Sequence, residues 1–171
     1  NDPEEPVMPD KQEKGTVEFD HVSFAYPEAG ENVINDITFK AEKGQTVAII
    51  GSTGSGKSTL INLIPRFYDV TKGCVKVDGV DVRDMTQHDL RDRLGYVPQK
   101  GVLFSGTIDS NIRYGNPDMS EADVQLAAQI AQSDDFIEAK PEGYHAPVSQ
   151  GGTNVSGGQK QRLSIARAIA K

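Results

Sequence analysis

Alternating apolar and polar residues mark the start of the patterned part of the chain. From Thr16, the stretch TVEFDHVSF sets Val17 and Phe19 between polar residues, which predicts a strand with one buried face. The next stretch, DITFKAEKGQTVAII, predicts two apolar strands joined by a turn at Lys43-Gly44. The chain is therefore expected to open with β-structure.

The pattern becomes helical after Gly51 and predicts a helix that runs to about Phe67. The stretch GCVKVDGVDV then returns to the strand pattern, and its Asp78-Gly79 pair predicts a hairpin turn. Strand and helix signals thus alternate along the first half of the chain, which indicates a mixed α/β domain.

Two start signals and one apolar face predict further helices. Thr86 stands before QHDLRDRL, and Ser120 with Asp123 three residues later forms a capping-box pattern before EADVQLAAQIAQ. The final stretch QKQRLSIARAIA places apolar residues along one helix face, which indicates core packing: Leu163, Ala166 and Ala170. The α/β domain is therefore expected to carry an added helical middle.

Composition narrows the class of protein. With 171 residues and 36% hydrophobic content, the chain can bury the core of one domain. It carries 18 Lys and Arg against 25 Asp and Glu, a net charge of −7, so it lacks the basic surface that nucleic acid requires and no nucleic-acid partner is expected. No apolar run is long enough to span a membrane and no secretory signal pattern stands at the start, so membrane association is expected through a partner.

The first 15 residues differ from the rest. Pro3, Pro6 and Pro9 stand among acidic residues, a composition that cannot bury a core, so residues 1–15 are predicted to be an extended linker arriving from something upstream. Residues 16–171 are then the predicted domain. The single Cys74 cannot form an internal disulfide, which fits a reducing compartment and a role in strand packing.

The strongest chemical signal is VAIIGSTGSGKSTL. Its Gly-x-x-x-x-Gly-Lys-Ser spacing follows an apolar run and opens a predicted helix, which is typical of a phosphate-binding loop. Glycines let successive N–H groups turn inward around a phosphate, and the helix start adds roughly +0.5 charge. The predicted phosphate-binding residues are Gly51, Ser52, Thr53, Gly54, Ser55, Gly56, Lys57, Ser58 and Thr59. Lys57 can reach the β- and γ-phosphate oxygens, and the Ser58 hydroxyl suits a Mg²⁺ ion.

A phosphate loop alone leaves kinases, GTPases, motor ATPases and transport ATPases open. The chain ends on NVSGGQKQRLSIARAIAK, in which two glycines at a helix start cost helix stability, so a bound phosphate is the first explanation to consider and a flexible cap the second. Residues 156–162, SGGQKQR, resemble the signature sequence of ATP-binding-cassette (ABC) ATPases. FAYP around Tyr26 resembles the adenine-stacking loop of that family, YVPQ ending at Gln99 resembles its glutamine loop, and LFSGTIDSNI is similar to its exporter branch.

The resemblance spans Thr16 to Lys171 and implies a fold and a set of roles. The fold is α/β, a P-loop NTPase of the ABC ATPase type with an antiparallel β subdomain and a helical subdomain. The aspartate strand, the catalytic glutamate and the switch histidine of the family are expected after Lys171, so the 171 residues as written are expected to hydrolyse ATP poorly. Tyr26 is implied to stack on adenine, Lys57 and Gln99 to be catalytic, and Ser58 and Gln99 to hold Mg²⁺.

The resemblance also implies partners. A second nucleotide-binding domain would meet ATP through the signature residues Ser156, Gly157, Gly158 and Gln159, so that two domains enclose two nucleotides head to tail. A transmembrane domain of the same polypeptide would hold the domain at the cytoplasmic face of the cell membrane. The expected function is ATP binding and hydrolysis that power export of a substrate which the sequence does not identify.

Two other functions remain open at this stage. One is a nucleotide-gated association module that does not hydrolyse ATP, and the other is a soluble cassette ATPase without a transport role. Ser149-Gln150 stands where many exporters have Gly-Glu, which leads to the hypothesis of a heterodimeric exporter with two unequal sites.

Overall fold

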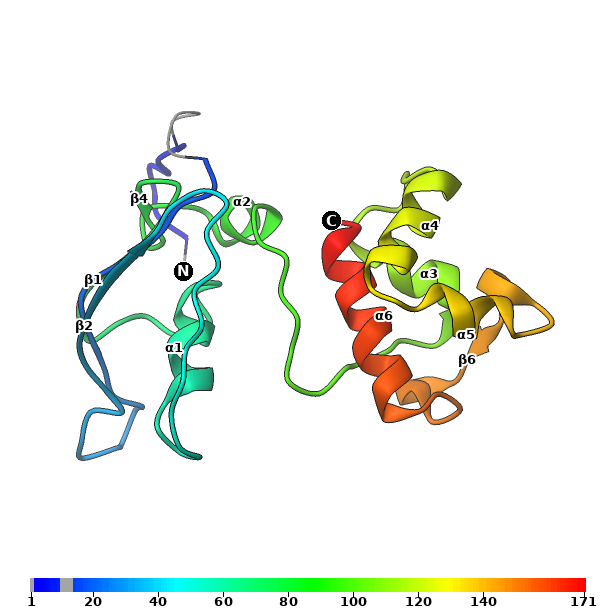
Figure 1. Cartoon of the computed structure of the whole chain (residues 1–171). Helices are drawn as coiled ribbons and strands as arrows, with labels where there is room; N and C mark the ends of the chain where they lie inside the picture. The colour runs from blue at the N-terminus through cyan, green and yellow to red at the C-terminus, as the bar shows by residue number, and fades with distance from the viewer. Residues whose placement is uncertain (1, 10–13) are drawn as a thin grey trace. The chain divides into compact units, whose positions relative to one another are not determined.

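The computed structural model describes residues 2–9 and 14–171, and the chain divides into two compact units (Figure 1). The first unit ends at Leu94 and the second runs from Gly95 to Lys171. The parts of the predicted linker at residues 1 and 10–13 lie outside the described residues. In the described parts of the chain, no helix is long and apolar enough to cross a bilayer.

An antiparallel sheet with the strand order β2-β1-β3-β4 forms the first unit. The strands are β1 (Val17–Phe24), β2 (Ile34–Ala41), β3 (Lys72–Val77) and β4 (Val80–Asp81). The hairpin predicted at Asp78-Gly79 is confirmed, with φ of +52° and +79° at these two residues. The strand predicted from Thr16 onward and the first of the two strands predicted around Lys43-Gly44 are confirmed as well.

Two helices complete this unit, α1 (Lys57–Leu63) and α2 (Gln87–Asp92). The Thr86 hydroxyl accepts a hydrogen bond from the Asp89 backbone N–H at 3.0 Å, which confirms the predicted start of α2. Helix α1 ends at Leu63, earlier than predicted; a turn at residues 64–66 follows, in which Arg66 takes a left-handed φ of +53° that a helix cannot include. Side chains from both helices and the sheet share one core: Phe19, Val22, Leu63, Val75, Met85 and Leu90.

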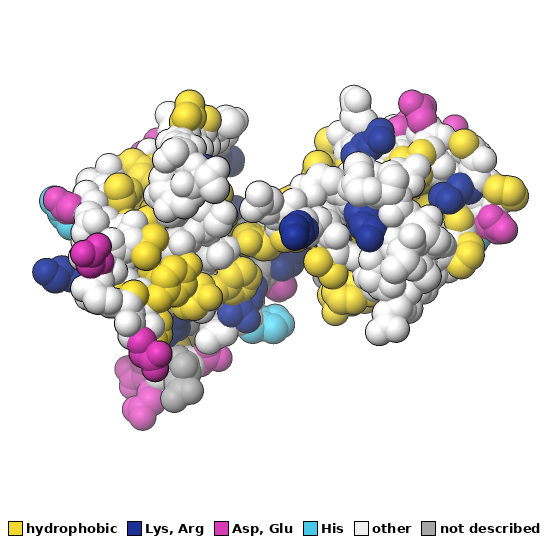
Figure 2. All heavy atoms as spheres, turned by 90° about the horizontal axis from the view of Figure 1, so that it is seen from below, with side chains coloured by type: hydrophobic (Ala, Val, Ile, Leu, Met, Phe, Trp, Pro, Cys, Tyr) yellow, Lys and Arg dark blue, Asp and Glu magenta, His cyan; other side chains and the backbone are white. Residues whose placement is uncertain are grey.

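The strand predicted for the stretch QTVAII is wrong for this structure. Residues 45–50 form no strand, and within residues 2–9 and 14–171 no other strand pairs with them. An isolated extended segment gains no ladder hydrogen bonds, so apolar composition alone does not make it a strand. Ile50 is 93% exposed and Val47 48% exposed, and Figure 2 shows hydrophobic side chains at the surface of this unit.

The described residues of the predicted linker contact the first unit. The Asp2 carboxylate accepts a hydrogen bond from the Gln87 N–H at 2.9 Å, and the Val7 N–H donates to the Asp84 carbonyl at 2.8 Å. These bonds tie the segment to the start of α2. The boundary between a linker ending at residue 15 and a domain starting at residue 16 stays a prediction.

Helices dominate the second unit. They are α3 (Ile108–Ile112), α4 (Glu121–Ile130), α5 (Asp134–Glu138) and α6 (Gly157–Ile169), with short 3₁₀ turns at Arg113–Gly115, Gly143–His145 and Gln150–Gly152. A two-stranded ribbon pairs β5 (Gly106–Thr107) with β6 (Pro147–Val148). The helical middle predicted from the sequence is therefore present.

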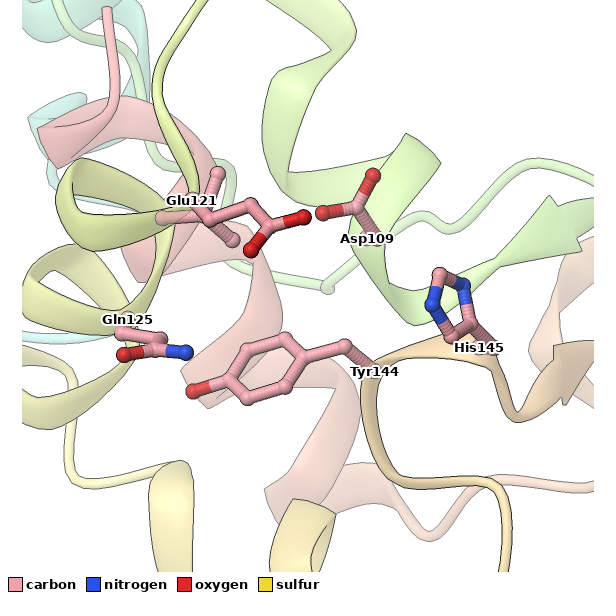
Figure 3. Close-up of a pocket in the computed structure, with 6 residues that line it drawn as sticks. Asp109, Glu121, Gln125, Tyr144 and His145 are labelled. Carbon is pink, nitrogen blue, oxygen red and sulfur yellow. The ribbon is translucent and has the colours of Figure 1, made fainter.

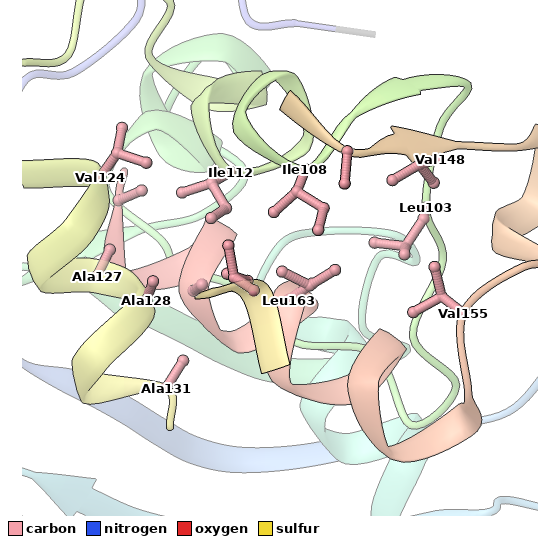
Figure 4. Packing of buried hydrophobic residues seen from close by; sticks show 14 residues of the cluster. Leu103, Ile108, Ile112, Val124, Ala127, Ala128, Ala131, Val148, Val155 and Leu163 are labelled. Carbon is pink, nitrogen blue, oxygen red and sulfur yellow. The ribbon is translucent and has the colours of Figure 1, made fainter. Parts of the chain in front are cut away.

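The core of the second unit packs around α6 (Figure 4). Leu163, Ala166 and Ala170 are at most 3% exposed, which confirms the predicted core face of this helix. At the start of α4, the Ser120 hydroxyl accepts from the Asp123 N–H at 3.2 Å, as predicted. The Asp123 carboxylate, however, accepts from the Ser120 hydroxyl instead of the Ser120 backbone, so the capping box is only half formed.

A buried polar clamp joins α3 to α6. The Asn111 side chain is 1% exposed; its amide accepts from the Phe104 N–H and donates to the Phe104 and Thr107 carbonyls, each at 2.9 Å. Arg167 of α6 donates to the Asn111 side-chain oxygen and to the Asn111 carbonyl, both at 2.8 Å. Burial lowers the pKa of Arg167, and its guanidinium lies 5.0 Å from the Phe104 ring centroid.

Candidate functional site

Glycine conformation shapes the phosphate loop. Gly54 and Gly56 take left-handed φ values of +82° and +87°, which side-chain-bearing residues rarely adopt. A Cβ on Gly56 would also come within 2.8 Å of the Ile34 side chain and 3.1 Å of the Val33 carbonyl oxygen. Gly56 is the N-cap of α1 and offers no side-chain acceptor, so the first N–H groups of the helix are left for a ligand.

Lys57 holds the loop in shape. Its Nζ donates to the Gly51 carbonyl at 2.9 Å, to the Ser52 carbonyl at 2.6 Å and to the Ser55 hydroxyl at 3.3 Å. The ammonium group therefore lies inside the curve of the loop, and a phosphate oxygen would be a stronger, charged acceptor for the same donors. The role predicted for Lys57 in binding phosphate stays a prediction.

A pocket of about 300 Å³ opens beside the loop. Its lining consists of Tyr26, Val33, Gly54, Ser55, Gly56, Lys57, Ser58 and Thr59. The Tyr26 hydroxyl lies 2.9 Å from the Thr59 hydroxyl oxygen, which fixes the ring next to the start of α1. The structure thus brings Tyr26, far away in the sequence, to the predicted phosphate loop.

Some predicted residues lie elsewhere around this loop, and one lining residue was missed. Gly51 and Ser52 contribute carbonyls to Lys57 and do not line the pocket, and Thr53 is exposed on the same turn. Val33 lines the pocket but was not singled out from the sequence. It precedes β2 without a motif, so only its neighbours in space identify it.

The signature residues start helix α6 as predicted. The Ser156 hydroxyl accepts from the Gln159 N–H at 3.3 Å, and the Gln159 side-chain oxygen accepts from the Ser156 N–H at 3.1 Å, which is a complete capping box. Gly157 and Gly158 have open space where a Cβ would stand. The capping role of Gln159 was missed, although the Ser-x-x-Gln spacing in the sequence was a sufficient signal.

Gln99 is exposed on a bend of the second unit. The neighbouring Pro98 carbonyl accepts from the Gln161 side chain at 3.4 Å, which ties this bend to α6. The phosphate loop belongs to the first unit, so the parts predicted for Gln99 and the signature residues in phosphate chemistry stay predictions.

A second pocket, in the second unit, has the wrong charge for a polyphosphate. It measures about 180 Å³ and is lined by Asp109, Glu121, Val124, Gln125, Tyr144 and His145. Figure 3 shows the carboxylates of Asp109 and Glu121 turned toward each other. Burial, together with the nearby acidic residues Asp134 and Glu138, raises the pKa of Tyr144. Because like charges repel, this pocket does not suit a phosphate, and the loop around Lys57 is the candidate nucleotide site.

The described residues offer few side-chain ligands for a metal ion. Among residues 2–9 and 14–171, no group of three or more His, Cys, Asp or Glu residues gathers where it could hold a metal ion. The Ser58 hydroxyl lines the phosphate-loop pocket, and hydroxyl, phosphate and water oxygens are the ligands that Mg²⁺ prefers. The pocket therefore fits a Mg²⁺ ion that arrives with a nucleotide.

The phosphate loop, the aromatic residue beside it and the signature helix define an ABC-type nucleotide-binding domain, and the comparison with protein families agrees. The family model described as ABC transporter matches residues 34–171. The chain belongs to the ABC transporter family.

Individual relatives and one solved structure match most of the chain. The chain is 48% identical over 160 residues to the multidrug export ATP-binding/permease protein YgaD of Bacillus subtilis (strain 168), covering 94% of this chain and 28% of that protein. It is 47% identical over 158 residues to ATP-binding cassette sub-family B member 6 of Rattus norvegicus, covering 92% of this chain and 19% of that protein. A solved structure, a bacterial Atm1-family ABC exporter with ATP bound, matches with a TM-score of 0.90 and 41% identity over 98% of this chain and 29% of that one. The chain spans less than a third of the length of these proteins.

Proposed function

We propose that this chain is the ATP-binding and ATP-hydrolysing domain of an exporter, and that it powers transport of a substrate across a membrane. One observation carries the proposal: the Lys57 ammonium lies 2.9 and 2.6 Å from the Gly51 and Ser52 carbonyls, inside a loop that ends on a left-handed glycine at a helix start. Membership of the ABC transporter family supports it, as do the similarity to a protein named for multidrug export and the likeness to the solved structure of an ABC exporter.

Each residue of the loop has a distinct part in this proposal. The N–H groups at the start of α1 bind the β-phosphate, and Lys57 moves from the loop carbonyls to the β- and γ-phosphate oxygens. The Ser58 hydroxyl would hold a Mg²⁺ ion, which would supply charge neutralisation for the transferred phosphoryl group. Tyr26 offers its ring to the adenine, an apolar contact beside the loop.

The remaining predicted residues divide between two roles, Gln99 at the attacking water or metal and the signature residues toward a second domain. Gln99 orients the attacking water or the metal, and Ser156, Gly157, Gly158 and Gln159 present a helix start to ATP held by the partner domain. Closure of two such domains around two nucleotides would drive the transmembrane domain of the same polypeptide, with this domain at the cytoplasmic face of the membrane. The open glycine surface at the start of α6 is compatible with such an approach.

Loss of the Lys57 ammonium tests the proposal. In the full-length protein that carries this chain, Lys57→Ala is expected to lower ATP turnover about 100-fold or more, because the transition-state charge loses a positioned cation. Lys72→Ala removes an exposed lysine of β3 in the same unit and should leave turnover within about twofold. Turnover that survives Lys57→Ala while domain closure weakens would contradict the proposal and favour a module that binds without hydrolysing.

A further inference from the structure

Three aromatic rings meet beside the phosphate loop. Tyr26 lies 4.9 Å from Phe24 and 5.2 Å from Tyr68 between ring centroids, with interplanar angles of 82° and 89°. Phe24 and Tyr68 are themselves 5.5 Å apart. All three centroid distances lie within the range in which aromatic contacts are attractive; Tyr26 meets both partners edge to face, and Phe24 and Tyr68 are tilted by 47°.

The three rings differ in how they are held. Phe24 ends β1 and is 2% exposed, so the sheet fixes it. Tyr26 follows the strand in an irregular segment and is held by its side chain, through the hydroxyl bond of 2.9 Å to Thr59 and the two ring contacts. Tyr68 is 40% exposed and comes from the turn after α1.

A local ion pair fixes the turn that presents Tyr68. Arg66 and Asp69 stand on either side of the Phe67-Tyr68 pair, and the Arg66 Nε donates to the Asp69 carboxylate at 2.7 Å. This hydrogen bond lowers the pKa of Asp69, so the pair persists at neutral pH. The Phe67 N–H donates to the Asn62 carbonyl at 3.1 Å, which anchors the turn to α1. Tyr68 therefore contacts Tyr26 from a restrained turn.

We infer that Tyr68 is a positioning residue for the base of the bound nucleotide, acting through Tyr26. The hydroxyl bond to Thr59 by itself fixes only one end of the Tyr26 side chain and would let the ring turn about its long axis, so the ring contacts with Phe24 and Tyr68 set its orientation. The contact with Tyr68 at 89° opposes that rotation, so the base meets a ring of constant orientation. The inference rests on the proposed nucleotide site, and it assigns base affinity to a residue that does not line the pocket.

The test distinguishes the affinity that comes from the base from the affinity that comes from the triphosphate. In the full-length protein carrying this chain, Tyr68→Leu should weaken MgATP binding about three- to tenfold, while the affinity for magnesium tripolyphosphate stays within about twofold. Tyr68→Phe keeps the ring and should bind MgATP like the unchanged protein. The Michaelis constant for ATP should rise in Tyr68→Leu with little change in the turnover number, because the phosphate loop is intact.

Phe67→Leu is the matched control. Phe67 is 46% exposed and adjacent in the chain, but its ring lies 5.5 Å from the Arg91 guanidinium. Loss of the Phe67 ring should not alter the ratio of the MgATP affinity to the magnesium tripolyphosphate affinity. Tyr68→Met is measured in parallel, since methionine fills similar space without a ring, and the same loss of MgATP affinity is expected.

The outcomes are distinct when both ligands are titrated by calorimetry. MgATP affinity lost in Tyr68→Leu and Tyr68→Met but kept in Tyr68→Phe supports the inference. Unchanged MgATP affinity in Tyr68→Leu or Tyr68→Met, or equal weakening of both ligands, overturns it. If the unsubstituted protein binds neither MgATP nor magnesium tripolyphosphate, that result would instead refute the proposed nucleotide site.

Discussion

Removal of the Asn111 amide is the sharpest stability test that the second unit offers. Asn111→Ala deletes three hydrogen bonds to the backbone of residues 104 and 107, together with the acceptor of one Arg167 N–H. Each neutral bond contributes roughly 1 kcal/mol net, and the charged one about 1.5–3 kcal/mol. Phe104 is 42% exposed, so water can satisfy part of what the amide leaves behind. The free energy of unfolding should therefore fall by about 3 kcal/mol.

Equilibrium urea denaturation of the full chain, followed by circular dichroism, measures this loss. Asn116→Ala removes an exposed asparagine of the same unit and should change the free energy of unfolding by less than about 0.5 kcal/mol. A loss below about 1 kcal/mol for Asn111→Ala would refute the reasoning, because it would mean that the clamp is solvated. A double-mutant cycle with Arg167→Ala should give a coupling energy of about 0.5–3 kcal/mol, since the two side chains share a bond.

Two further predictions concern β1. Gly73→Ala should lower the free energy of unfolding by more than about 3 kcal/mol, because Gly73 has a φ of +73° and a Cβ there would strike the Asp20 and His21 carbonyls of β1. Gly30→Ala is the control, since a Cβ on Gly30 stands in open space. Equal stability of the two variants would contradict the predicted clash. The His21 ring nitrogen lies 2.7 Å from the Asp36 carboxylate, which raises the His21 pKa above 6.5, so the pair stabilises the fold below pH 6.5 and loses its effect as pH rises through the raised value. An NMR titration of His21 should show this upward shift, and Asp36→Asn should remove it; a midpoint unaffected by Asp36→Asn would exclude the ion pair as its cause.

Local sequence signals predicted the parts of the fold that neighbouring residues determine. The Asp78-Gly79 hairpin and the Thr86 helix start depend on residues one to three positions apart, so their chemistry is visible in the sequence. The stretch at residues 45–50 shows the limit. Its apolar character is real, but strand formation depends on a partner that none of the described residues supplies.

The candidate site shows the same difference between local features, which the sequence predicts, and contacts between distant residues, which it does not. The phosphate loop and the Ser156 helix start follow from spacing; in the structure Gly54 and Gly56 have left-handed φ values, and Ser156 caps α6. The contact of Tyr26 with Tyr68 joins residues 42 positions apart, and no periodicity connects them. The Asn111–Arg167 clamp is hidden for the same reason, since an asparagine within a helix usually indicates only a polar surface.

The capping box at the start of α6 lets ligand binding and helix capping share one hydroxyl group. The Ser156 oxygen accepts from the Gln159 N–H, and the Ser156 O–H can donate to an anion at the same time. The other bond, from the Ser156 N–H to the Gln159 side chain, uses separate atoms and can persist. The helix start can therefore take up an anion without giving up an internal hydrogen bond, and a Ser156→Ala variant would change helix stability and anion affinity at once.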